Sequence, residues 1–200
     1  MSFWDARFGE EGFAYGTEPN EFLVSQASLI PRGRVLCLAE GEGRNAVFLA
    51  QRGYAVHAID ISPVGLEKAK KLAESRGVTI TTEVADLTQR PLERDHWSGI
   101  VSIWAHMPAD VRAILHRQIA GALVPGGVFV LEAYAPRQLA MPGRGGPKEQ
   151  PGMFMPLAAL RQELSDLDIV HATEIDREVN EGKYHSGLSA VTQFVGRRPM

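Results

Sequence analysis

Glycines and carboxylates gather in a short stretch near residue 40. Gly41 and Gly43, followed by Ala46, have the form Gly-x-Gly-x-x-Ala, which is typical of turns that present a nucleotide-like cofactor to the start of a helix. Glu40 and Glu42 alternate with these glycines. We interpret Glu42 as an acid placed favourably by the dipole of the following helix, and Glu40 as a candidate for cofactor contact. The turn therefore predicts a cofactor site but fits more than one cofactor.

Two further acids end the next two expected strands. Asp60 follows Gly41 by nineteen residues, where a carboxylate can accept hydrogen bonds from both hydroxyls of an adenosine ribose. An alternative role for Asp60 as a helix N-cap is weaker, because Ser62 is better placed for it. Asp86 ends a third strand, where its carboxylate could accept a hydrogen bond from the exocyclic amine of adenine or could simply form a turn.

The turn and the two acids fit either a nicotinamide dinucleotide or S-adenosylmethionine (SAM). A dinucleotide needs a second half-site and usually a substrate domain, but only about seventy residues follow the fifth expected strand and they return to the same sheet. SAM has no phosphate, fits one half-site, and carries positive charge that suits the neighbouring Glu40 and Glu42. The sequence favours SAM as cofactor, with S-adenosylhomocysteine (SAH) as the product.

Alternating strand and helix patterns must position these residues. Such alternation predicts an α/β fold with a doubly wound, mostly parallel sheet and helices on both faces. Two final β-like runs, joined by "NEGKYHSG", predict a C-terminal antiparallel pair that makes the sheet seven-stranded. We expect strands at 34–39, 54–60, 78–86, 98–104, 128–134, 169–179 and 188–198, and helices at 44–53, 62–77, 108–127 and 156–165.

Composition limits the class of protein. The 200 residues predict one domain, 1–200, and a net charge of −3 argues against a nucleic-acid partner. A single cysteine, Cys37, excludes an intramolecular disulfide framework, and no ligand spacing predicts a metal site. The early acids of "MSFWDARFGEEGF" and the lack of a long apolar run predict a cytoplasmic chain without a membrane partner. The oligomeric state is left open.

Several side chains near the expected ligand edge could act on a substrate. His106 in "WAHMP" and His185 in "EGKYHSG" are candidate bases, although a lone histidine is more often structural. Arg112, in the next helix, and Lys148, in the Gly- and Pro-rich loop 135–153, are candidates for substrate binding, with a solvated surface as the alternative for each. Tyr134 could form a wall of the substrate pocket, and Trp104 could be a stacking platform for the substrate, although packing in the protein is the favoured role for Trp104.

Motifs along nearly the whole chain resemble class I SAM-dependent methyltransferases, in particular small bacterial enzymes related to the tellurite-resistance and thiopurine methyltransferases. They include "WDARFG", "AYGTEPN", "AEGEGRNAVFLA", "VHAIDISPVGLEKAKKLA", "ADL", "HMPADVR", "LVPGGVFVLEAY", "GRGGPK" and "EGKYHSG". The family often has an acid at the position of Cys37 and a glycine at that of Ala39. Neither change removes a backbone hydrogen-bonding group, so we expect binding to survive.

The resemblance implies roles for individual residues. Ala39, Glu40 and Gly41 would line the methionine part of SAM, Asp60 would bind ribose, and residues from Ile103 to His106 would lie under the methionine end and the substrate. The segment 1–30 would cover the cofactor, with 135–153 over the site. The other implied cofactor contacts are Ile61, Asp86 and Leu87 beside adenine, Tyr15 in the cover, and Gly43 and Asn45 in the glycine-rich loop.

These observations predict methyl transfer to a small-molecule acceptor by direct displacement at the methyl group, with alignment as the main contribution to catalysis. Two alternatives remain open at this point. One is a short nicotinamide-dependent reductase, and the other is a module that binds SAM without catalysis. The identity of the acceptor lies beyond the sequence.

Overall fold

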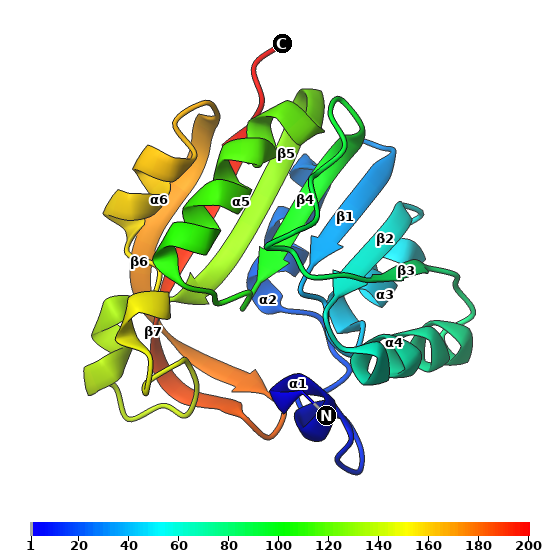
Figure 1. Cartoon of the computed structure of the whole chain (residues 1–200), viewed down its shortest axis with the longest axis vertical. Coiled ribbons are helices and arrows are strands. Elements are labelled where there is room, and N and C mark those ends of the chain that lie inside the picture. Colours follow the sequence, from blue (N-terminus) through cyan, green and yellow to red (C-terminus); the bar gives the residue numbers. More distant parts are fainter. Residues whose placement is uncertain (1) are drawn as a thin grey trace.

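The computed structural model describes residues 2–200 and places a seven-stranded sheet at the centre of the chain (Figure 1). The strand order is β3-β2-β1-β4-β5-β7-β6, in which β1 to β5 pair in parallel and β7 lies antiparallel between β5 and β6. This confirms the predicted mixed sheet and its C-terminal antiparallel pair. The strands are β1 (Arg34–Leu38), β2 (Ala55–Asp60), β3 (Thr81–Val84), β4 (Trp97–Ile103), β5 (Leu123–Tyr134), β6 (Asp168–Glu181) and β7 (His185–Arg197).

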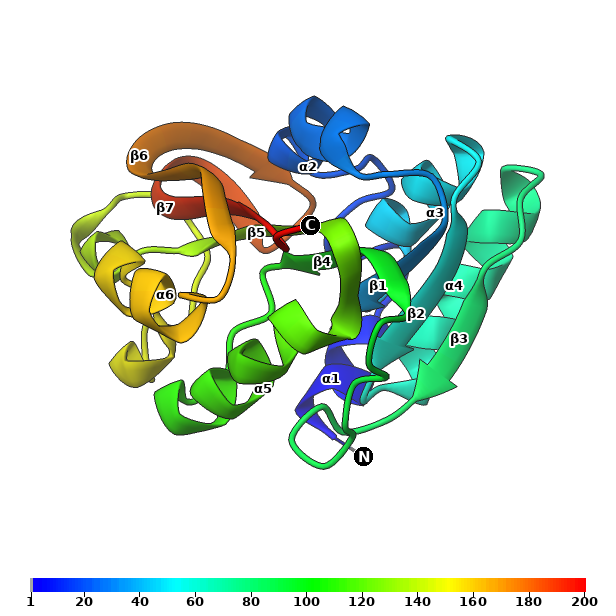
Figure 2. The same ribbon diagram turned by 90° about the horizontal axis from the view of Figure 1, so that it is seen from above.

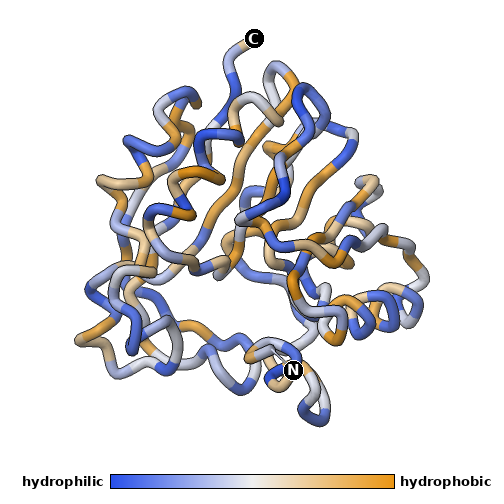
Figure 3. The backbone as a smooth tube through the Cα atoms, viewed as in Figure 1, coloured by the Kyte–Doolittle hydropathy of each residue, from blue (hydrophilic) through white to orange (hydrophobic). Residues whose placement is uncertain are grey.

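Helices cover both faces of this sheet (Figure 2). On one face α2 (Glu21–Gln26), α3 (Arg44–Gln51) and α4 (Pro63–Ser75) pack on strand residues such as Val35 and Val101. On the other face α5 (Ala109–Ala122) and α6 (Leu157–Glu163) pack on the alternate set, which includes Leu36 and Ile100. The central strands are therefore apolar on both sides, and Figure 3 shows hydrophobic residues concentrated along them.

Local signals explain where α4 begins and ends. The hydroxyl of Ser62 accepts a hydrogen bond from the backbone N–H of Gly65, and Pro63 occupies the first helical position, where its missing N–H costs nothing. Gly77 follows the helix with φ +68°, a conformation that ends a helix and favours glycine. These features match the predicted boundaries closely.

The helix predicted at 108–127 is shorter than expected. It ends at Ala122, and Leu123 is already extended and paired with Trp97 at the start of β5. Pro125 and Gly126 therefore lie in an irregular first part of the strand rather than at a helix end. The segment "NEGKYHSG" also belongs mostly to the strands, because the turn of the β6–β7 hairpin takes only residues 182–184.

The chain contains short helices that the sequence patterns did not predict. The first is α1 (Phe3–Phe8), which begins at a capping box formed by Ser2 and Asp5. Beyond α2, which was also unpredicted, there are short 3₁₀ helices at Ala27–Leu29, Pro136–Ala140 and Pro151–Met153. None of the helices described for residues 2–200 is long and apolar enough to cross a membrane.

Two segments that are distant in the sequence meet at the carboxyl edge of the parallel strands. In Figure 1 α1 and the tip of the β6–β7 hairpin both lie below the ends of β1 and β4. The backbone N–H of Lys183, at that tip, donates to the carbonyl of Ala14 over 2.8 Å, which joins the hairpin to the N-terminal segment. This edge is where ligands bind in open α/β sheets.

Candidate functional site

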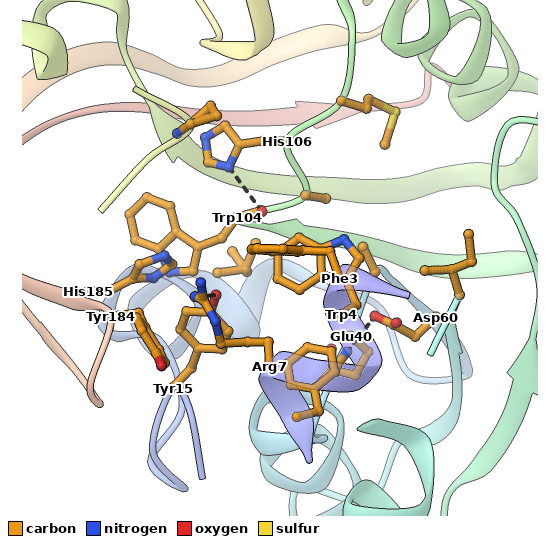
Figure 4. Close-up of a pocket in the computed structure, with 18 of the residues that line it drawn as sticks. Phe3, Trp4, Arg7, Tyr15, Glu40, Asp60, Trp104, His106, Tyr184 and His185 are labelled. Atoms are coloured by element: carbon orange, nitrogen blue, oxygen red, sulfur yellow. Dashed lines mark hydrogen bonds between the residues drawn. The ribbon is translucent and has the colours of Figure 1, made fainter. Parts of the chain in front are cut away.

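A cavity of about 1000 Å³ opens at this edge (Figure 4). Its wall is formed by the glycine-rich turn after β1, the ends of β2, β3 and β4, helix α1, residues 144–150 of the loop, and the hairpin tip. Small-molecule sites commonly measure about 300 to 1000 Å³, so this cavity has room for a cofactor together with an acceptor.

Most of the site residues predicted from sequence meet in this one wall, although they come from distant parts of the chain. The exceptions are Gly43, Arg112 and Tyr134, which do not line it. The predicted residues that do line it are Tyr15, Ala39, Glu40, Gly41, Asn45, Asp60, Ile61, Asp86, Leu87, Ile103, Trp104, His106, Lys148 and His185.

The turn after β1 is held in shape by the side chain of Glu40. One of its carboxylate oxygens accepts hydrogen bonds from the backbone N–H groups of Asn45 (3.0 Å) and Ala46 (2.8 Å), in the first turn of α3. Ala39 has φ +48° and Gly41 has φ +63°. Glycine adopts such backbone angles freely, whereas Ala39 adopts them at a cost, which gives a physical reason for the glycine that the resemblance associates with this position.

Burial strongly affects the charge state of Glu40. The low-polarity surroundings raise the pKa of its carboxyl group to about 7, and the two backbone N–H groups and the charge of Arg44 offset this only in part. Near neutral pH the group is therefore poised between its neutral and charged forms, and a nearby positive charge would favour the charged form.

Asp60, at the end of β2, also braces the turn. Its carboxylate accepts hydrogen bonds of 2.8 Å from the backbone N–H groups of Gly41 and Ser62. Burial raises the pKa of Asp60, and the two backbone bonds oppose that rise. A carboxylate offers about four acceptor positions, so the two in use leave capacity for ribose hydroxyl groups.

The end of β3 supplies an open rim. Asp86 is exposed, and it accepts a hydrogen bond of 2.8 Å from the N–H of Thr88, as a turn-forming aspartate does. Leu87 lies beside it in the cavity wall, and the side chain of Ile61 is 48% exposed across the same rim. This rim therefore offers apolar contacts with the acceptor atoms of Asp86 beside them.

Glu42 has a different role from the one predicted. Its buried carboxylate accepts a hydrogen bond of 2.8 Å from the backbone N–H of Ala14 and pairs with Lys68 at 3.0 Å. It therefore fastens the N-terminal segment to the turn. Tyr15 follows in that segment and lines the cavity, where its hydroxyl accepts a hydrogen bond from Arg7.

Trp104 forms the wall beyond the end of β4. Its backbone has φ +59°, which is unusual for a bulky residue, and such strain tends to occur at functional sites. The indole N–H donates to Glu181, which also pairs with Arg44 and Arg177. This buried network fixes the orientation of the tryptophan ring.

His106 is held in a way that argues against the predicted role as a base. Its Nδ1 lies 3.0 Å from the carbonyl of Trp104, and its Nε2 accepts the backbone N–H of Tyr134 over 3.0 Å (Figure 4 shows the first bond). Nδ1 must therefore carry the hydrogen, and no ring nitrogen is left to take a proton. Burial lowers the pKa of His106 to about 4, so it joins β4 to β5 as a neutral group.

His185, at the start of β7, lies among aromatic rings in the cavity wall. Its ring centre is 4.6 Å from that of Tyr15 and 5.0 Å from that of Trp104. Within residues 2–200 its buried Nδ1 has no hydrogen-bond partner. Burial lowers the pKa of His185 to about 3, so the ring is neutral and is a weak base.

Arg112 does not reach the cavity, and the prediction of substrate binding is wrong. It is buried between α5 and α6, where its guanidinium pairs with Glu163 at 2.7 Å and donates to the carbonyl of Phe154. His116 contacts the same carboxylate at 2.6 Å. The alternative of a solvated helix face is also wrong, because these partners satisfy Arg112 inside the protein.

Gly43 and Tyr134 also lie behind the wall rather than in it. A Cβ atom on Gly43 would come within 2.5 Å of the Cβ of Ala69, so this glycine allows α4 to pack on the turn. Tyr134 is fully buried and its ring stacks on Trp104 at 4.4 Å. Tyr134 therefore supports the wall from behind.

Lys148 lines the cavity from the loop, as predicted for a substrate contact, but its amine donates to the carbonyls of Met141 (3.2 Å) and Gly143 (3.1 Å). Sequence reasoning missed other wall residues, above all those of α1. The pattern "SFWD", a serine followed three residues later by an acid, is a capping-box signal that could have revealed this helix. The missed residues include Phe3, Trp4, Arg7, Phe8, Arg144 and Tyr184.

Metal ligands do not cluster in the described chain. Across residues 2–200 no group of three or more histidine, cysteine, aspartate or glutamate side chains is arranged to hold a metal ion. Cys37 is fully buried in β1, and burial raises the pKa of its thiol well above the usual value. The thiol of Cys37 is therefore not poised to act as a reactive thiolate.

Sequence comparison gives a consistent set of relatives. Residues 35–127 match the family described as "Methyltransferase domain". The chain is 29% identical over 112 residues to 2-heptyl-1-hydroxyquinolin-4(1H)-one methyltransferase of Mycobacteroides abscessus, covering 54% of this chain and 48% of that protein. It is 31% identical over 116 residues to tRNA 5-carboxymethoxyuridine methyltransferase of Escherichia coli K12, covering 54% and 42%. The chain thus spans less than half the length of these curated relatives.

Solved structures share the fold at low sequence identity. A structure concerned with conversion of a disulfide bond into a thioacetal group during echinomycin biosynthesis has a TM-score of 0.77 and 22% identity, covering 98% of this chain and 92% of the other. TehB from Haemophilus influenzae has a TM-score of 0.73 and 17% identity, covering 88% and 61%. These likenesses establish the fold.

Proposed function

We propose that this chain is a class I SAM-dependent methyltransferase and that it transfers the methyl group of SAM to a small-molecule acceptor. The observation that carries this proposal is the single cavity in which the glycine-rich turn and Asp60 share a wall with Trp104 and His185. One end of the cavity can therefore hold the cofactor and the other end the acceptor, with no wall between them.

The residues present fit this cofactor. We propose that Asp60 binds the ribose hydroxyls, that Ile61 and Leu87 contact adenine beside Asp86, and that Ala39, Glu40 and Gly41 hold the methionine part. Tyr15, Asn45 and Ile103 complete this side of the wall. Bound SAM supplies an activated methyl group, so the chain's own task is to align an acceptor with it.

The acceptor side supports alignment more strongly than proton transfer. Both ring nitrogens of His106 take part in hydrogen bonds. His185 has a pKa of about 3, so at neutral pH it is too weak a base to remove a proton from an acceptor efficiently. Trp104 and His185 are instead fixed by buried neighbours and can orient a planar acceptor. We therefore assign His106 to positioning Trp104 and Tyr134, and His185 to contact with the acceptor.

A small-molecule acceptor fits a cavity that encloses its ligands between α1, the loop and the hairpin. The quinolone-type methyltransferase among the relatives acts on a small molecule by its name, while another relative acts on tRNA. The net charge of −3 favours the first of these alternatives.

Calorimetric titration with SAH tests the cofactor assignment. We expect binding by the wild-type chain and a loss of about 10- to 100-fold in affinity for Asp60→Ala, as for removal of charge-assisted hydrogen bonds. Because Asp60 also braces the turn, Asp60→Asn and a thermal melt of each variant separate lost contacts from lost folding. No SAH binding by folded wild-type protein at millimolar concentration would refute the proposal. Binding of NADH instead would point to the reductase alternative.

A further inference from the structure

The cavity has opposite charge at its two ends. Around the proposed cofactor side the titratable side chains are the carboxylates of Glu40, Asp60 and Asp86, together with Glu42, which is paired with Lys68. The far end, at the hairpin tip, carries the guanidinium groups of Arg7 and Arg144. Figure 4 shows Arg7 together with Tyr15, Tyr184 and His185, on the other side of the cavity from Asp60.

Both arginines rest on one tyrosine ring. The guanidinium carbon of Arg7 lies 3.6 Å from the centre of the Tyr184 ring, and that of Arg144 lies 4.9 Å from it. Stacking of this kind orients a guanidinium while leaving its N–H groups available for a ligand. The hydroxyl of Tyr184 donates to Glu10 over 2.5 Å, which holds the ring in place.

The backbone beneath Arg144 is also fixed. The N–H of Arg144 donates to the carbonyl of Ser186 over 2.6 Å, and the N–H of Ser186 donates back over 2.9 Å. The neighbouring N–H of Gly143 donates to Leu188 over 3.0 Å. The loop is thus docked on the hairpin at the residue that carries the charge, so the position of Arg144 at the cavity is built into the fold.

The other charged groups at this end do not neutralise the two arginines. Among residues 2–200 neither Arg7 nor Arg144 forms an ion pair. Glu10 lies 3.7 Å from Lys183, and Arg44 is paired with Glu181. Lys148 and Glu149, both exposed in the loop, are opposite in charge. A positive excess therefore remains at the acceptor end.

We propose that Arg7 and Arg144, stacked on Tyr184, form a subsite for an anionic group on the methyl acceptor. The acceptor class is a planar molecule that carries a carboxylate or a similar anion, with its body against Trp104 and His185. This inference rests on the proposed function, because it names the class of acceptor for the same site. An anion here is bound by charge-assisted hydrogen bonds, which are stronger than those between neutral groups.

The test compares matched acids and amides on SAH-saturated protein. A panel of aromatic pairs, such as 4-mercaptobenzoate with 4-mercaptobenzamide and benzoate with benzamide, is titrated by calorimetry. We expect at least one acid to bind about 10- to 100-fold more tightly than its amide. Arg144→Ala should remove most of that preference, and Arg144→Lys should keep part of it. Arg7→Ala should reduce it as well.

Arg137→Ala is the matched control, because Arg137 is an exposed arginine outside the cavity wall that pairs with Asp176 at 2.6 Å. Its acid preference should equal that of the wild type. The proposal is overturned if no acid in the panel binds, if acids and amides bind alike, or if the preference survives in both Arg7→Ala and Arg144→Ala. It is also overturned if Arg144→Ala weakens SAH binding instead, since the arginine would then hold the cofactor's carboxylate.

Failure of the proposed function gives a different result. If the wild-type protein does not bind SAH, the methyltransferase proposal fails at that step. The same acid and amide pairs titrated without SAH still report whether the two arginines bind an anion. A thermal melt of every variant shows whether it is folded, and Arg144→Lys provides a second variant if Arg144→Ala is not.

Discussion

Replacing Glu40 by glutamine should stabilise the ligand-free protein, and increasingly so as the pH rises. The pKa of Glu40 rises from an ordinary 4.5 to about 7 because the folded protein buries the carboxyl group. Below pH 4.5 the group is protonated in both the folded and unfolded states. Between pH 4.5 and 7 the unfolded state releases this proton while the folded state keeps it, so the stability contributed by Glu40 is lost as the pH rises.

The size of the effect follows from the shift. One pKa unit corresponds to about 1.4 kcal/mol, so the full change in the free energy of unfolding is about 3 kcal/mol. Glutamine stays neutral, and its side-chain carbonyl can still accept the hydrogen bonds from Asn45 and Ala46. The stability of Glu40→Gln minus that of wild type should therefore grow by about 2 to 3 kcal/mol between pH 5 and pH 8.

Urea unfolding of both proteins at several pH values measures this difference. The comparison is needed because His106 and His185 act in the opposite direction. Burial lowers their pKa values to about 4 and about 3, so their contribution is present above pH 6.5 and is lost as the pH falls. Glu67→Gln, which removes an exposed carboxylate from α4, is the control. Parallel stability curves for wild type and Glu40→Gln would refute the reasoning.

Three further substitutions test the packing around the site by urea unfolding. Ala39→Gly should stabilise the protein by up to about 1 kcal/mol, because φ +48° favours glycine, and a loss of stability would contradict this. Gly43→Ala should cost about 2 kcal/mol or more, since its Cβ would lie 2.5 Å from Ala69; an unchanged midpoint would show that α4 can shift. Arg112→Ala should lower the free energy of unfolding by about 3 to 5 kcal/mol, because the largely buried Glu163 would lose its arginine partner. A loss of less than about 1 kcal/mol would mean that water reaches Glu163.

The order of the strands and the edge that carries the site could be predicted because they depend on pattern and connectivity. Hydrophobic runs separated by helical segments specify a parallel sheet, and the ends of its strands must meet. The direction of individual side chains could not be predicted in the same way. Tyr134 ends β5 at the correct edge, yet its ring turns behind Trp104. Arg112 is satisfied by Glu163, fifty-one residues later, and no local pattern announces such a pair.

The N-terminal segment shows a second limit of sequence patterns. Its six-residue helix α1 is too short to give a periodic signal, and only its capping box stands out. Its position depends on distant contacts, such as the hydrogen bond from Ser62 to Asp5 (2.6 Å) and the buried bond between Glu42 and Ala14. These contacts bring Arg7 to the hairpin, so the positive end of the cavity exists only in the folded chain.

Two acids outside the first strand brace the turn, and this has a consequence for binding. Cys37, within that strand, is buried and carries no carboxylate. Glu40 and Asp60 instead accept the backbone N–H groups of the turn. The carboxylate of Glu40 lies in the cavity wall, on the side where we propose that the methionine part of SAH binds with its ammonium group.

Binding of SAH should accordingly favour the charged form of Glu40 and release a proton. With a free pKa of about 7, the affinity should rise up to tenfold per pH unit below pH 7 and level off above it. Calorimetry at pH 6 in two buffers with different ionisation enthalpies counts the protons released, and we expect a value near one for wild type. Glu40→Gln should release none and lose the pH dependence. Equal proton release by the two proteins would show that another group is responsible, and no release by either would place the ammonium group away from Glu40.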